Sequence, residues 1–119
     1  PINIEASNIV WLDNQSTNWV DEKSGAQISF LLESNTNDLK SLFVKLPTGY
    51  AGKFETNGTV LHSVVIKGEL SYQLPNNGET KILDVGSYFG STDTAIHTIV
   101  NTNSEDILYI RTNGTIKVG

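Results

Sequence analysis

Two histidines, His62 and His97, are the side chains of this sequence most suited to chemistry. Imidazole is the commonest metal ligand in proteins and changes its charge near neutral pH. Because the sequence contains no cysteine, thiolate metal sites and cysteine nucleophiles are excluded. The candidate chemistry therefore centres on imidazole.

Tyr109 and Arg111 form a second candidate pair, because they lie two residues apart in a segment with a β pattern. Side chains two apart on a strand share one face, so both are expected at the same surface. The guanidinium of Arg111 would bind a carboxylate or a phosphate at that surface. The alternative is an ordinary surface arginine.

Length and charge narrow the classes of protein. For a chain of 119 residues, folding hides roughly two thirds of the surface, which suits a single domain over residues 1–119. The net charge of −5 lacks the basic surface that binds phosphates, so neither nucleic acid nor an anionic membrane is an expected partner. No basic and apolar leader opens the sequence, so we expect a cytoplasmic chain.

Short runs of β-branched and aromatic residues alternate with clusters of Gly, Asn, Asp and Pro, which predicts an all-β chain. The predicted strands cover residues 2–12, 26–32, 41–46, 52–55, 59–67, 69–74, 80–85, 96–102, 106–112 and 115–118. Residues 75–78 and the pair Asn113-Gly114 have the composition of hairpin turns. Strands of this number and length are typical of a sandwich, a jelly roll or a closed barrel.

Residues 86–101 resemble the second motif of the cupin superfamily of small β-barrels. Gly86, His97 and Asn101 agree with that motif in identity and spacing, whereas the usual Pro-x-Gly before the histidine is replaced by residues 92–94. The resemblance implies a cupin-type double-stranded β-helix, that is, an RmlC-like jelly-roll barrel. It also implies that His97 points into the barrel.

The first cupin motif is degenerate in this sequence. Glu55 and Asn57 stand where the motif has two histidines, and Gly68 matches its closing glycine. The glutamate position falls on Leu61, or on His62 if a longer spacer is used. Since neighbouring strand residues face opposite ways, these two do not both point inward unless a bulge intervenes.

By this resemblance the chain would offer Glu55, Asn57, His62 and His97 to a divalent metal ion such as iron, manganese, nickel or zinc. Two imidazoles and one carboxylate are the minimum for a facial-triad site, with the amide as a neutral oxygen donor. Each residue also has a plainer interpretation. Glu55 suits a solvated surface, Asn57 suits a turn, and His62 suits an outward strand position or a satisfied core position.

Three functions fit the resemblance, and whether the chain is an enzyme stays open. The first is binding of a small polar ligand, such as an organic acid or a sugar derivative, in the barrel pocket. Its expected contacts are His97, His62, Tyr109 and Arg111. The second is a metal-dependent oxygenase or isomerase.

The third function is a regulatory or structural role. Residues 64–70 and 86–91 resemble an uncharacterised group of barrel cupins that includes relatives of the anti-sigma cupin domain of ChrR type. Small cupins commonly dimerise and long edge strands need cover, so we expect a homodimer.

Overall fold

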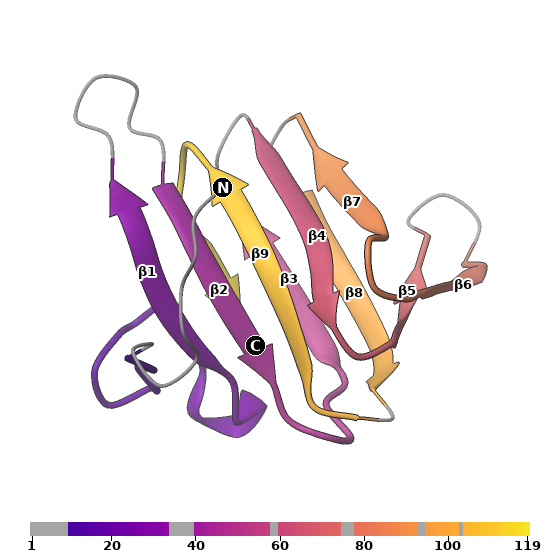
Figure 1. The fold of residues 1–119 in the computed structure, drawn as a ribbon, viewed down its shortest axis with the longest axis horizontal. Coiled ribbons are helices and arrows are strands. Elements are labelled where there is room, and N and C mark those ends of the chain that lie inside the picture. Colours follow the sequence, from indigo (N-terminus) through magenta and orange to yellow (C-terminus); the bar gives the residue numbers. More distant parts are fainter. Residues whose placement is uncertain (1–9, 34–39, 58–59, 75–77, 93–94, 103) are drawn as a thin grey trace.

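The computed structural model consists of two five-stranded antiparallel sheets that face each other (Figure 1). It describes residues 10–33, 40–57, 60–74, 78–92, 95–102 and 104–119. Sheet A has the strand order β1-β2-β9-β4-β7, and sheet B has the order β10-β3-β8-β5-β6. The strands are β1 (Gln27–Glu33), β2 (Lys40–Leu46), β3 (Gly52–Thr56), β4 (Leu61–Lys67), β5 (Leu70–Gln73), β6 (Thr80–Leu83), β7 (Tyr88–Ser91), β8 (Ala95–Thr102), β9 (Asp106–Thr112) and β10 (Ile116–Val118).

Most of the predicted strands are confirmed, with small changes of boundary. The segment predicted at residues 2–12 lies largely outside the described residues, and its last residue, Leu12, forms an isolated bridge with Ile28 of β1. Strand β7 was not predicted, because glycines at 86 and 90 interrupt the alternating pattern there. A short 3-10 turn, η2 (Glu22–Ser24), was also missed.

The turn predicted at Asn113-Gly114 is a crossover rather than a hairpin, so that prediction is wrong. Strands β9 and β10 belong to different sheets. The Asn113 side chain accepts a hydrogen bond from the Val60 amide at 3.0 Å, and the Thr112 hydroxyl donates to the Val60 carbonyl at 2.9 Å. These bonds fasten the crossover to the start of β4. The other predicted hairpin is confirmed, because β5 pairs with β6.

Strand register stacks the inward side chains in layers between the sheets. Strands β2, β8 and β10 begin at the same end of the barrel. We call this end the mouth. Its outermost layer contains Lys40, Thr112, Leu61 and Ser91 from sheet A and Ile116, Thr56 and Ala95 from sheet B. The next layer contains Leu42, Ile110, Ser63 and Phe89 from sheet A and Val118, Phe54 and His97 from sheet B.

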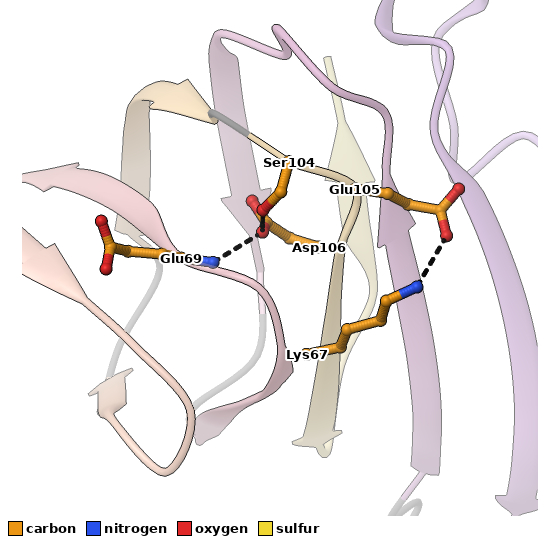
Figure 2. A network of polar contacts seen from close by, with 5 residues as sticks. All are labelled: Lys67, Glu69, Ser104, Glu105 and Asp106. Atoms are coloured by element: carbon orange, nitrogen blue, oxygen red, sulfur yellow. Dashed lines mark hydrogen bonds and ion pairs between the residues drawn. The ribbon is translucent and has the colours of Figure 1, made fainter.

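Asp106 ties the strands together at the end opposite the mouth, where it is fully buried (Figure 2). Its Oδ1 accepts hydrogen bonds from the Glu69 amide at 2.9 Å and the Ser104 hydroxyl at 3.0 Å. Desolvation raises the pKa of the Asp106 carboxyl, although both hydrogen bonds act against that rise. The nearby ion pair between Lys67 and Glu105, 3.4 Å long, is exposed and adds little stability. The β4–β5 turn is therefore held by a buried carboxylate.

Gly68, the glycine of this turn, should not tolerate a larger residue. Its φ is +87°, and a Cβ built there would collide with the Asp106 carboxylate. We expect Gly68→Ala to lower the free energy of unfolding by roughly 2–4 kcal/mol, because a left-handed alanine costs about 1–2 kcal/mol before any collision. Urea denaturation measures the loss.

Gly86→Ala is the matched control, since Gly86 has a φ of +92° and open space around its Cβ position. It should lose only the backbone part. Equal losses in the two variants would contradict the role assigned to Asp106.

Candidate functional site

His97 lies in the interior of the barrel, on the inner face of β8, and only 3% of it is exposed. Its partner across the β3–β8 pair is Phe54, which is fully buried. The Phe89 ring from the opposite sheet lies 5.2 Å away, centroid to centroid. The inward orientation predicted for His97 is therefore confirmed.

Both ring nitrogens of His97 have hydrogen-bond partners. The Tyr72 hydroxyl lies 2.8 Å from Nδ1, and the Ser91 hydroxyl lies 3.1 Å from Nε2. Tyr72 comes from β5 and is buried, whereas Ser91 ends β7 in the mouth layer and is half-buried. Burial lowers the pKa of His97 and raises the pKa of Tyr72, so both side chains are neutral at pH 7.

Glu55 and Asn57 do not join His97. Both are exposed, and the inner positions at the end of β3 are Phe54 and Thr56. The Asn57 side chain accepts a hydrogen bond from the Thr115 amide at 2.7 Å, which is turn chemistry. The pairing of β3 with β8 thus presents a phenylalanine and a threonine where a cupin metal site would need two ligands.

His62 also lies outside the barrel. The start of β4 pairs regularly with β7 and β9, so no bulge turns His62 inward, and its ring packs on Tyr88 with centroids 5.7 Å apart. Leu61 is the inward residue, and only 1% of it is exposed. Within the described ranges, no group of three or more His, Asp or Glu side chains is placed to hold a metal ion. The predicted donor set therefore does not fit a cupin metal centre.

Tyr109 and Arg111 share a face of β9, as predicted, but it is the outer face of sheet A. The inner face of β9 belongs to the buried Asp106, Leu108, Ile110 and Thr112. The Tyr109 hydroxyl donates to Ser41 at 3.1 Å, and Arg111 lies opposite His62 in the strand register. The four residues predicted to contact a ligand thus divide between the interior and the outer surface.

A cleft of about 500 Å³ opens where β3 ends and β8 and β10 begin, next to the mouth. Its lining includes Trp19, Glu55, Asn57, Ile96 and Lys117. Two residues predicted as metal ligands therefore line a surface cleft instead. The aromatic and cationic lining residues, Trp19 and Lys117, are not among the contacts predicted from the sequence.

Sequence reasoning also missed the partners of His97. Neither Tyr72 nor Ser91 is among the contacts predicted from the sequence. A usable signal existed for Tyr72, because it shares the strand face of the apolar Leu70 and is thereby directed inward. No sequence signal pairs either residue with His97, since the contacts join separate strands.

A family model described as a domain of unknown function, DUF4437, matches residues 1–119. The chain belongs to this family. No curated protein matches the DUF4437 chain. No helix among the described residues has the length and apolar character that a membrane crossing requires.

Solved structures share the fold of the DUF4437 chain at low identity. An acetylacetone dioxygenase from Acinetobacter johnsonii has a TM-score of 0.69 and 15% identity, over 98% of this chain and 74% of that one. An RmlC-like cupin from Shewanella frigidimarina has a TM-score of 0.68 and 17% identity, over 94% and 88%. An RmlC-like cupin from Ralstonia eutropha has a TM-score of 0.68 and 12% identity, over 96% and 69%. The predicted cupin jelly roll is therefore confirmed.

The buried imidazole should make stability depend on pH. Burial lowers the pKa of His97 below its ordinary value of 6.5, so at lower pH the unfolded chain binds a proton that the folded chain excludes. The free energy of unfolding then falls as the pH falls below 6.5, by at most about 1.4 kcal/mol per pH unit. We expect His97→Gln to remove this component in urea denaturation at a series of pH values.

His62→Gln is the matched control, because it replaces the exposed histidine and leaves His97 in the interior. The raised pKa of Asp106 acts with the opposite sign, since it lowers stability as the pH rises. That contribution is common to both variants and cancels in their comparison. The same pH dependence in both variants would contradict a buried, neutral His97.

Metal content tests the separation of the predicted ligands. His62 lies on the outer face of sheet A, whereas His97 lies on the inner face of sheet B. We therefore expect protein purified without chelator to hold no metal that depends on both residues. Elemental analysis of the wild type, His62→Ala and His97→Ala measures this. A stoichiometric metal that is lost in both variants would show that the two imidazoles meet.

Proposed function

We propose that the DUF4437 chain binds a small polar ligand at the mouth of its cupin barrel, against Ser91 and His97. The observation that carries the proposal is the hydrogen-bonded chain of Tyr72, His97 and Ser91. It begins in the buried interior and ends at a half-buried hydroxyl in the mouth layer.

Polar side chains in the interior lower the stability of the fold wherever one of them lacks a hydrogen-bond partner. A buried hydroxyl without a partner costs about 1–3 kcal/mol. The Ser63 hydroxyl, fully buried in the His97 layer, has no partner among the described residues. Ser63 and Ser91 are diagonal neighbours on the inner faces of β4 and β7, roughly 7–8 Å apart. The unpartnered Ser63 hydroxyl and the half-buried Ser91 hydroxyl lie on the same inner wall. This arrangement suits a polar ligand.

The cleft next to the mouth has the volume of a small-molecule site. The adjacent cleft of about 500 Å³ lies within the range of roughly 300–1,000 Å³ for small-molecule sites. Its inward lining residues Thr56, Ala95 and Ile116 are the mouth layer of sheet B, and His97 is the next inward residue of β8 after Ala95. The cleft combines apolar lining residues such as Trp19 and Ile116 with polar ones such as Asn57 and Lys117, and Ser91 and His97 lie beside this lining.

Nuclear magnetic resonance of protein labelled with ¹⁵N in its histidines tests the proposal. We expect at least one of acetate, acetone and glucose to shift the ring signals of His97 saturably, because binding at Ser91 changes the hydrogen bond to Nε2. The exposed His62 is a control within the same molecule and should not follow. If no probe shifts His97 while the protein stays folded, the proposal fails.

A further inference from the structure

The hydrogen bonds between Tyr72, His97 and Ser91 have a direction that their surroundings decide. Tyr72 has one hydroxyl proton and is only 7% exposed. Among the described residues, its hydroxyl has a single hydrogen-bond partner, Nδ1 of His97. If the phenol donates, Nδ1 is the acceptor, and the neutral imidazole carries its proton on Nε2.

The opposite direction is less stable. With Ser91 donating to Nε2 and Nδ1 donating to Tyr72, the phenolic proton would stay buried without an acceptor, at a cost of roughly 1–3 kcal/mol. Ser91 suffers no such loss in either direction, because its half-buried hydroxyl can reach water. The chain therefore runs from Tyr72 to His97 to Ser91.

This direction leaves one donor for a ligand. Nε2–H donates to the oxygen of Ser91, so the proton of the Ser91 hydroxyl points away from the imidazole. No other described residue accepts it. We infer that the ligand presents a hydrogen-bond acceptor, a carbonyl or carboxylate oxygen, to the hydroxyl of Ser91. The inference rests on the proposed function and adds the chemical class of the ligand.

The tautomer of His97 tests the direction without any ligand. The ¹⁵N shifts of the two ring nitrogens distinguish a protonated from an unprotonated nitrogen in labelled protein. We expect Nε2 to carry the proton and Nδ1 to be unprotonated at pH 7. A proton on Nδ1 would overturn the inference and leave the proposed binding function standing.

Three small probes of similar shape test the ligand class: acetate, acetone and isopropylammonium. We expect acetate and acetone to shift the His97 signals saturably and isopropylammonium to bind more weakly, because it offers the Ser91 proton no acceptor. Equal or tighter binding of isopropylammonium would overturn the inference. If acetate and acetone leave His97 unshifted while glucose shifts it, the inference fails and the proposed function stands; if glucose fails as well, the proposed function itself fails.

Ser91→Ala removes the donor with little change of volume. It should weaken the binding of acetate and acetone roughly three- to tenfold, the effect of one lost hydrogen bond. Ser71→Ala is the matched control, because Ser71 is a half-buried serine on the outer face of β5 and should leave both affinities unchanged. Unchanged affinities in Ser91→Ala would contradict the inferred contact.

Discussion

The pairing of β3 with β8 is the constraint on which the interior of this barrel depends. Phe54 lies directly opposite His97, and side chains alternate along both strands, so Glu55 and Ile96 face outward. A slip of one residue would expose Phe54 and bury the Glu55 carboxylate. Burying a phenylalanine stabilises the fold by roughly 1.5–3 kcal/mol, whereas an unpaired buried carboxylate costs several kcal/mol. Packing thus selects the register that excludes Glu55 from the centre.

The two ends of the barrel use buried polar groups differently. Opposite the mouth, the Asp106 carboxylate is fully buried, and its Oδ1 accepts hydrogen bonds from the Glu69 amide of the β4–β5 turn and from the Ser104 hydroxyl, while its Oδ2 has no partner among the described residues. Toward the mouth, Tyr72 and His97 are buried but their hydrogen bonds lead to a half-buried hydroxyl. The first arrangement fixes the turn. The second has an open end, which is why the mouth is the candidate site.

Local patterns in the sequence were enough to predict the fold, but long-range pairing determined the site. Alternating apolar residues and turn residues predicted most strands, and the spacing from Gly86 to His97 predicted the inward histidine. Motif spacing placed Glu55 and Asn57 one residue from the inner positions Phe54 and Thr56 of β3, and His62 one residue from the inward Leu61 of β4. Tyr72 reaches His97 because β5 pairs with β8 in sheet B. Ser91 lies on β7 of the opposite sheet, so the packing of the two sheets brings it to His97.

The ring contacts of the two histidines distinguish a His97 inside the barrel from one outside it. Nuclear Overhauser effects between aromatic ring protons report which rings lie within a few ångströms of one another. We expect contacts from His97 to Phe89 and Tyr72, whose ring centroids lie 5.2 and 5.9 Å away, and from His62 to Tyr88. A His97 ring without contacts to Phe89 or Tyr72, or close to His62, would contradict a barrel with His97 at its centre.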